Sequence, residues 1–291
     1  MKRGEFIKTL GMLGAGWTLV PGYVDATDWS SAEDNRMPVM FVGHGSPLNA
    51  IADNAYTQAL TAVSGRIPRP KAILVISAHW LTRGSYVTGN AEPPTIHDFY
   101  GFPEELYALQ YPAPGTPGAA KMTMEMLKKV NGMADMRRGL DHGAWSVLRH
   151  LYPKADIPVY ELSIDRSSRL EEQYLIGRLV RDLRDKGILI IGSGNLTHNL
   201  GEMAEEVDAE VPLWAEEFDA KVANFLVRGD HKALTQYESW GKISRLAHPS
   251  NDHYLPLIYV TGMLHEGEAV EFFYEGFEYG CISMRGLIAG I

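Results

Sequence analysis

The sequence is nearly free of cysteine: Cys281 is the only one among 291 residues. A single thiol excludes an intramolecular disulfide framework and a zinc site built on several cysteines. If the protein binds a metal ion, histidines and carboxylates must supply the ligands. The chain has 10 histidines, so such a site is well within its composition.

Positive charge is also scarce. Lys and Arg total 27 against 36 Asp and Glu, which gives a formal net charge of -9, and no basic run exceeds two residues. Proteins that read nucleic-acid phosphates concentrate Lys and Arg on one surface, so we expect no nucleic-acid partner. Hydrophobic residues make up 45% of the chain, which is typical of a folded globular protein rather than a disordered one.

The N-terminal 36 residues differ from the rest. Lys2, Arg3 and Lys8 precede a largely apolar stretch over 9–20, and Pro21, Gly22 and small residues follow. This is the layout of an export signal, and the stretch is too short for the roughly 20 residues of a stable membrane span. Residues 3–8 resemble a twin-arginine motif whose second arginine is replaced. We expect 1–36 to be an export signal and linker, which favours a periplasmic or exported protein over a cytoplasmic one.

From residue 37 onward, strand-like and helix-like segments alternate. Short continuous apolar runs predict buried strands at 38–42, 72–76, 158–162 and 187–191. Apolar residues at three- and four-residue spacing predict helices over 50–63, 118–130, 144–151 and 169–185. Two more strands, 270–274 and 282–284, are expected to form a terminal hairpin. The pattern predicts a single α/β domain, 37–291, with a mainly parallel or mixed central sheet flanked by helices.

Three of the predicted strands are each followed by a histidine. His44 follows the first, His79 the second, and His198 the strand that ends in Gly192-Ser193-Gly194. Ligands of open α/β sheets bind outside the carboxyl ends of the strands, so we expect these imidazoles at one edge of the sheet. Neutral imidazole is a common ligand of zinc and iron, and a reactive site needs open positions beside its protein ligands. The sequence therefore predicts a metal site at the strand ends.

Other motifs give weaker evidence of a function. The glycine-rich turns after the strands complete neither a dinucleotide fingerprint nor a phosphate-binding loop, and no H-E-x-x-H helix is present. Ser46 or Ser193 paired with a histidine stays open as a hydrolase nucleophile, although serine after glycine usually forms turns. We expect three further histidines to be structural or to face solvent: His150, His231 and His265.

Seven motifs taken together resemble a known family. They are Gly43-His44-Gly45-Ser46-Pro47, Ser77-Ala78-His79-Trp80, Pro94-Thr95-Ile96-His97-Asp98-Phe99, Tyr111-Pro112-Ala113-Pro114-Gly115, Asp141-His142-Gly143, Gly194-Asn195 with His198-Asn199-Leu200, and His253-Tyr254-Leu255-Pro256. In this order they resemble the class III extradiol ring-cleaving dioxygenases of the 4,5-DOPA dioxygenase type, within the LigB-like superfamily. The resemblance covers the chain after Met37.

The resemblance implies a role for each matching histidine. His44, His79 and His253 would hold one divalent metal, His198 would be the acid/base, and His142 would be a further active-site histidine. The broader class holds its iron with two histidines and a glutamate, whereas His253 stands at the third position here. The expected cofactor is Fe(II) for turnover, or Zn(II) as the bound metal. In a zinc form, His198 would be a candidate fourth ligand.

The implied reaction inserts O2 into a catechol such as DOPA and opens the ring beside the diol. Aromatic residues proposed as walls for the ring are Trp80, Phe99, Tyr100 and Tyr254, and His97 or Arg83 is a candidate partner for a substrate carboxylate. Two other functions use the same histidines. One is a zinc-dependent hydrolase, and the other is a non-catalytic metal-binding relative on the same fold.

Overall fold

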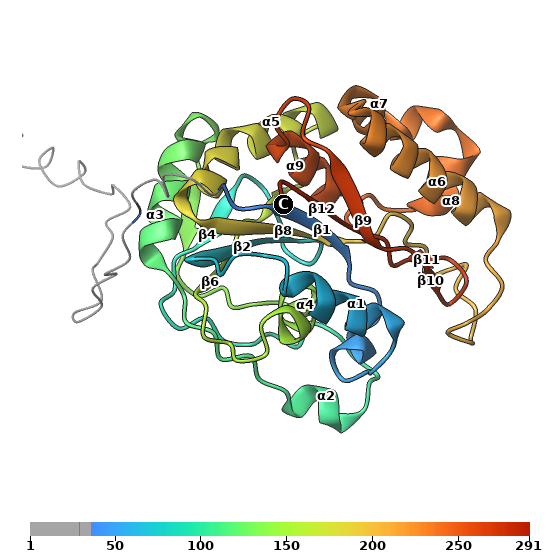
Figure 1. Cartoon of the computed structure of the whole chain (residues 1–291), viewed down its shortest axis with the longest axis horizontal. Coiled ribbons are helices and arrows are strands. Elements are labelled where there is room, and N and C mark those ends of the chain that lie inside the picture. Colours follow the sequence, from blue (N-terminus) through green and yellow to red (C-terminus); the bar gives the residue numbers. More distant parts are fainter. Residues whose placement is uncertain (1–28, 30–35) are drawn as a thin grey trace, which may run out of the picture.

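The computed structural model describes Trp29 and residues 36–291. The expected export signal and nearly all of its linker, 1–28 and 30–35, lie outside the described residues. Figure 1 shows one central sheet with helices on both faces. Within the described part of the chain, no helix has the length and apolar character needed to cross a membrane.

The central sheet has six strands in the order β6-β2-β8-β1-β12-β9. Their bounds are β1 Val39–Gly43, β2 Ala72–Ser77, β6 Val159–Glu161, β8 Ile188–Gly194, β9 Val270–Tyr274 and β12 Gly286–Ala289. The first four are parallel to one another, while β12 and β9 are antiparallel to their neighbours. The predicted α/β fold with a mixed sheet is confirmed.

The register of the parallel strands brings their carboxyl ends to one edge. Gly43 at the end of β1 is paired with Gly194 of β8, and Ser77 at the end of β2 is paired with Ser193. Because parallel strands all run toward the same edge, the segments that follow β1, β2 and β8 emerge side by side. This register places the histidine-bearing segments together.

Alternating side chains divide the core into two layers. Val39 and Phe41 of β1 face one layer, while Met40 and Val42 face the other, as expected from the period of two in a strand. Helices α5 and α9 cover the first face and α1 and α4 the second (Figure 1). The helices are α1 Ala55–Ser64, α2 Glu104–Ala108, α3 Pro117–Met126, α4 His142–Leu151, α5 Leu170–Val180, α6 Leu213–Arg228, α7 His231–Thr235, α8 Lys242–Ala247 and α9 Leu255–Met263.

Short strands lie outside the central sheet. They form three two-stranded pairs: β3 Leu81–Thr82 with β7 Ile164–Asp165, β4 Tyr86–Thr88 with β5 Met133–Asp135, and β10 Phe277–Glu278 with β11 Ile282–Ser283. The predicted hairpin between 270–274 and 282–284 is therefore wrong. β9 pairs with β12, and β12 in turn pairs with β1 of the central sheet. β11 pairs with β10 instead.

Several helix boundaries also differ from the prediction. α1 begins only after Asn54, whose side chain accepts a hydrogen bond from the Thr57 backbone N–H and caps the helix. The segment before it, Pro47–Ala50, is a 3-10 turn. The predicted helices 118–130 and 169–185 each end in 3-10 segments, Leu127–Val130 and Arg181–Lys186. Apolar spacing located these helices but not the tighter turns at their ends.

Candidate metal centre

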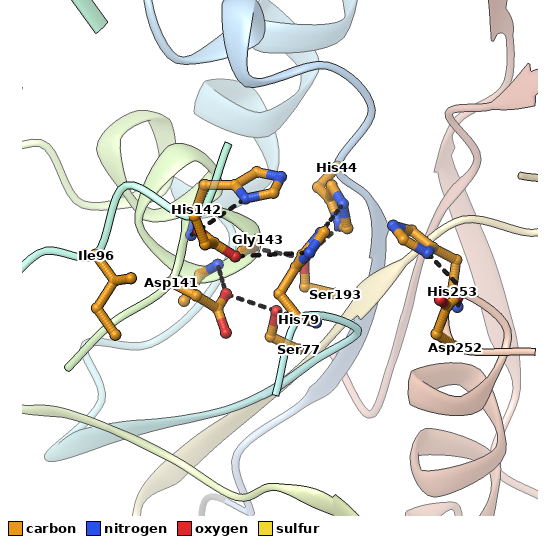
Figure 2. A network of polar contacts seen from close by, with 12 residues as sticks. His44, Ser77, His79, Ile96, Asp141, His142, Gly143, Ser193, Asp252 and His253 are labelled. Carbon is orange, nitrogen blue, oxygen red and sulfur yellow. Dashed lines mark hydrogen bonds and ion pairs between the residues drawn. The ribbon is translucent and has the colours of Figure 1, made fainter. Parts of the chain in front are cut away.

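Five histidines converge above the edge where β1, β2 and β8 end. His44 follows β1, His79 follows β2, and His198 follows β8, as predicted. His142 is the first residue of α4 rather than preceding that helix, and His253 lies in the loop before α9. Figure 2 shows the imidazoles of His44, His79, His142 and His253 gathered from separate segments of the chain.

The backbone at the end of β8 links two of these segments. The His44 N–H donates to the Gly194 carbonyl at 3.0 Å, and the Asn195 N–H donates to the His253 carbonyl at 2.9 Å. A Cβ at position 194 would lie 2.1 Å from that His253 oxygen, so only glycine permits the approach. Adjacent residues of one strand end thus fix the backbones of His44 and His253 relative to each other.

The rings of His44, His79 and His253 form a nearly equilateral triangle. Their centroids are 5.0 Å apart for His44–His79, 5.2 Å for His44–His253 and 5.0 Å for His79–His253. Metal–nitrogen bonds of about 2.0–2.1 Å place the centroids of two ligating imidazoles about 4.5–5.2 Å apart. The triangle fits a single ion. His79 and His142, with centroids 3.9 Å apart, are too close to fit this spacing.

Hydrogen bonds at the outer nitrogens fix the tautomers of two of these rings. The Ser193 hydroxyl donates to the Gly143 carbonyl at 2.6 Å, so its oxygen accepts from Nδ1 of His44 at 3.0 Å. The Asp252 carboxylate accepts from Nδ1 of His253 at 3.0 Å. Each ring therefore carries its proton on Nδ1 and keeps the Nε2 lone pair free, as metal-ligating histidines do.

The third ring faces His44. Nε2 of His79 lies 3.1 Å from Nε2 of His44, and Nδ1 of His79 lies 3.6 Å from Oδ2 of Asp98. The contact with Asp98 is too long for a hydrogen bond and does not fix the tautomer of His79, but its Nε2 is directed toward the Nε2 lone pair of His44. Donor set and geometry fit a divalent ion such as zinc or iron. By distance between ligand atoms alone, two other groups stand out: the nitrogens of His44, His79 and His142 lie within 4.8 Å of one another, and so do ligand atoms of His198, Asp252 and His253.

His198 lies flat against His253. The ring centroids are 3.5 Å apart and the planes differ by 2°. A metal ion lies near the plane of each imidazole that ligates it, because the nitrogen lone pair is in the ring plane. Two parallel rings stacked at this distance cannot both meet that condition for one ion. This geometry favours the acid/base role expected for His198 over a role as fourth ligand.

Burial keeps the imidazoles neutral. Burial is the main reason why the pKa values of His44 and His253 lie well below the usual value for histidine, and neighbouring histidines lower these pKa values further. Burial likewise lowers the pKa of His79 to about 3, with Asp98 opposing the shift, and the pKa of His198 to about 4. Neutral rings at pH 7 offer lone pairs to a metal or accept a proton.

A buried polar network lies behind the histidines. Ser77 donates to Asp141 at 2.6 Å, and Asp141 caps α4 at the Ala144 N–H. Arg138 donates to Asp141 at 2.6 Å and lies 3.6 Å from the buried Glu161. Because Asp141 precedes His142 and Ser77 ends β2, this network joins the two chain segments that carry His79 and His142.

The histidines form the floor of a cavity of about 820 Å³. Its other lining residues are Gly45, Ser46, Pro47, Ala78, Phe99, Phe102, Asn199, Leu200, Gly201, Met203, Pro249, Ser250, Asp252, Tyr279 and Ile282. The volume is within the usual range for small-molecule sites, about 300–1,000 Å³. The cavity and the three histidines whose spacing fits a metal ion together define a site for a small ligand.

Only one of the four proposed aromatic walls lines this cavity. Phe99 does, whereas Trp80 is buried under Arg138 and Tyr254 is buried against Tyr237. Tyr100 is 91% exposed and points away from the core. The prediction is therefore wrong for Trp80, Tyr100 and Tyr254. Aromatic character in the sequence did not distinguish a cavity wall from core or surface.

Neither predicted carboxylate partner reaches the cavity. Nε2 of His97 donates to the Leu109 carbonyl at 2.9 Å and the ring packs on Trp145, while Arg83 is exposed elsewhere. Ser193 is fully buried with its hydroxyl proton committed to Gly143, which removes it as a hydrolase nucleophile. Ser46 caps the turn that follows it by accepting from the Leu48 N–H.

Three histidines expected to be structural lie outside the cavity lining. His150 contacts the Asn49 carbonyl at 2.7 Å through Nε2, and His231 lies against Tyr174. His265 is partly buried, and its backbone N–H donates to Glu268 at 2.9 Å. These contacts agree with the structural roles expected for all three.

Comparison with known proteins identifies the family. Residues 38–286 match the family described as the catalytic LigB subunit of aromatic ring-opening dioxygenase. The chain belongs to this family. The resemblance inferred from the seven motifs is thereby confirmed.

Two relatives of this LigB-family chain carry the same name. It is 42% identical over 260 residues to 4,5-DOPA dioxygenase extradiol of Escherichia coli (strain K12), covering 88% of this chain and 95% of the relative. It is 38% identical to 4,5-DOPA dioxygenase extradiol of Beta vulgaris, covering 87% of this chain and 96% of that one. The crystal structure of an uncharacterized Escherichia coli K12 protein matches with a TM-score of 0.77 and 37% identity, covering 88% of this chain and all of that one.

Sequence reasoning missed several residues of the LigB-family site. Asp98 and Asp252 were not assigned a role, although Asp252 directly precedes His253 and Asp98 lies in a quoted motif. The sequence suggests only a nucleophile or a turn former at Ser193, whereas its hydroxyl oxygen accepts from Nδ1 of His44. The apolar lining residues Phe102, Leu200, Met203 and Ile282 were also missed, because no local pattern marks a residue as lining a cavity.

Proposed function

We propose that this protein is a metal-dependent extradiol dioxygenase that inserts O2 into a catechol ring and opens it beside the diol. In this proposal His44, His79 and His253 hold one divalent ion, Fe(II) for turnover. The observation that carries the proposal is the triangle of three imidazoles on the floor of a cavity of about 820 Å³. The names of the relatives point to DOPA-like substrates.

A bound Fe(II) would supply the Lewis acid that acidifies the diol and the redox centre that couples the ring to O2. The chain supplies positioning and proton transfer. His198 lines the cavity beside His253 and is neutral at pH 7, because burial lowers its pKa to about 4. It accepts a proton from a catechol hydroxyl at a ring nitrogen and returns it as the ring opens.

His142 supplies a second proton-active group. Its Nδ1 is held by the Asp98 carboxylate at 3.0 Å, so the proton is on Nδ1 and Nε2 is free to accept a hydrogen bond in the cavity. Phe99 and Ile282 on the cavity wall exclude water from an aromatic ring placed over the histidines. The chain thus binds the ring, orients it and moves the protons.

The test is anaerobic reconstitution with Fe(II), followed by measurement of O2 uptake and of a yellow ring-opened semialdehyde with DOPA and simpler catechols. The matched monophenols should not react, because one hydroxyl provides neither the second anchor nor an easily oxidised diol. His79→Ala should lose metal and turnover, while His231→Ala, outside the cavity, should retain both. An iron-loaded sample that consumes no O2 with any catechol yet hydrolyses an ester or phosphate would overturn the proposal.

A further inference from the structure

The wall of the cavity above the histidines is apolar. Phe99 and Phe102 form one part of it, and Leu200, Met203 and Ile282 form another. Phe99 and Phe102 meet edge to face with centroids 5.3 Å apart, so this part is a continuous aromatic surface. At about 820 Å³ the cavity holds more than a single ring, so part of this wall remains to face the substituent that the catechol carries.

Apart from histidine, the only ionisable side chains among the described lining residues are Asp252 and Tyr279. No lysine or arginine of the described chain lines the cavity. Arg138 lies behind His79, but its guanidinium donates to Asp141 and stacks on Trp80. Its charge is matched there by buried carboxylates and does not face the cavity.

Carboxylates also lie beside the histidines of the proposed metal site. Asp98 contacts His142 and His79, and Asp252 contacts His253. A divalent ion held by the three imidazoles would offset these two carboxylates and leave no positive charge for a further anion. A carboxylate on the substituent would then find no lysine or arginine among the described lining residues and would be repelled by Asp252, most strongly where water is excluded.

We propose, on the basis of the proposed function, that the cavity selects catechols with an uncharged or cationic substituent over catechols with an anionic one. The apolar wall accepts the uncharged chain, and the Asp252 carboxylate accepts a cationic end. DOPA, whose ammonium offsets its carboxylate, falls between the two groups. The selection is expressed in substrate affinity, since it arises from the walls and not from the reacting atoms.

The test uses catechols that differ only at the end of one side chain: 4-propylcatechol, dopamine and 3-(3,4-dihydroxyphenyl)propionate. Their dissociation constants are measured by calorimetry on the Fe(II)-loaded protein without O2, and kcat/KM is measured with O2. We expect the propionate to bind at least about tenfold more weakly than 4-propylcatechol, with dopamine at least equal to 4-propylcatechol. Low salt should widen the difference.

A charge placed on the wall should reverse the selection. Leu200 is 67% exposed at the cavity, so a longer polar side chain fits there without disturbing the core. In Leu200→Lys the ratio of propionate affinity to propylcatechol affinity should rise about tenfold. Leu200→Gln, similar in length and neutral, should leave that ratio unchanged.

Different results would overturn the charge selection and the dioxygenase assignment. If the propionate binds and reacts as well as or better than 4-propylcatechol, the charge selection is overturned while the dioxygenase assignment stands. If the catechols bind in the predicted order without being cleaved, the assignment fails and the selection stands. If none of the three binds to the metal-loaded protein, both are overturned.

Discussion

One carboxylate, that of Asp98, contacts both His79 and His142. Its Oδ1 accepts from the backbone N–H and Nδ1 of His142 at 2.9 and 3.0 Å, and its Oδ2 lies 3.6 Å from Nδ1 of His79. Asp98 therefore orients an expected metal ligand and an expected active-site histidine together. Removal of a residue that orients a metal-ligating histidine typically lowers metal affinity or activity about 10–100-fold.

We expect Asp98→Ala to weaken metal binding and to reduce kcat, each within that 10–100-fold range. Metal affinity is measured by competition with a chelator, and kcat by O2 uptake. Asp182→Ala, which removes a largely exposed carboxylate on another part of the surface, serves as the control. Unchanged metal affinity and kcat in Asp98→Ala would show that the contacts to His79 and His142 are incidental.

His198 is expected to be needed for turnover but not for metal binding. His198→Ala and His198→Phe should keep the ion and lose about 10²–10⁴-fold in kcat, the usual contribution of a positioned proton-transfer group. The Phe variant preserves the flat ring stacked on His253, so it separates proton transfer from packing. Elemental analysis and steady-state kinetics provide the measurements. Loss of the ion in both variants would instead make His198 a ligand.

The ion pair of Glu268 with Arg184 predicts a pH-dependent contribution to stability. Burial raises the pKa of Glu268, but hydrogen bonds from Arg184 and from the His265 N–H outweigh it, so the pKa is lowered overall. A lowered folded-state pKa stabilises the fold above the unfolded value of about 4.3, and this stabilisation is lost as pH falls through the folded pKa.

The free energy of unfolding of wild type minus that of Glu268→Gln should therefore be constant from pH 7 to about 5 and shrink toward pH 3. Urea titrations with chelator present throughout would measure it without a contribution from metal. Glu125→Gln alters a largely exposed carboxylate and should give a difference near zero at every pH. A difference for Glu268→Gln that grows on acidification would contradict the sign.

Residues 1–36 are expected to direct export. The full chain, produced in a bacterium, should appear in the periplasmic fraction with a mass that corresponds to cleavage near Ala26, whereas 37–291 should stay in the cytoplasm. Gly4→Arg, which completes the arginine pair, should raise the exported share, and Gly4→Ala should not. Full-length mass in the cytoplasm for the whole chain would refute the prediction.

The sequence was sufficient for the parallel part of the sheet and for the histidines at its edge. Runs such as 72–76 and 187–191 are buried on both sides, so they read as continuous apolar segments. α9 was missed for a related reason. All nine of its residues are buried, so no polar face reveals a helical period. β12 is short and begins with Gly286, which gave no strand signal.

The partners of the histidines depended on contacts that sequence does not contain. His44 meets Ser193 across 149 positions, and Asp98 meets His142 across 44. Only the packing of β1 on β8 and of the 95–99 segment on α4 brings these atoms together. The seven motifs nevertheless identified the family, because they preserve residue types at positions that the fold later makes adjacent.

The backbone link between His44, Gly194 and His253 has a consequence for biosynthesis. The first of these residues leaves the ribosome early, but the last lies near the C-terminus, and β12, which flanks β1 in the sheet, comes later still. A nascent or truncated chain that lacks this final portion has no third imidazole and an incomplete sheet. If these three histidines hold the ion as proposed, the full set of ligands exists only after residue 253 has been synthesised.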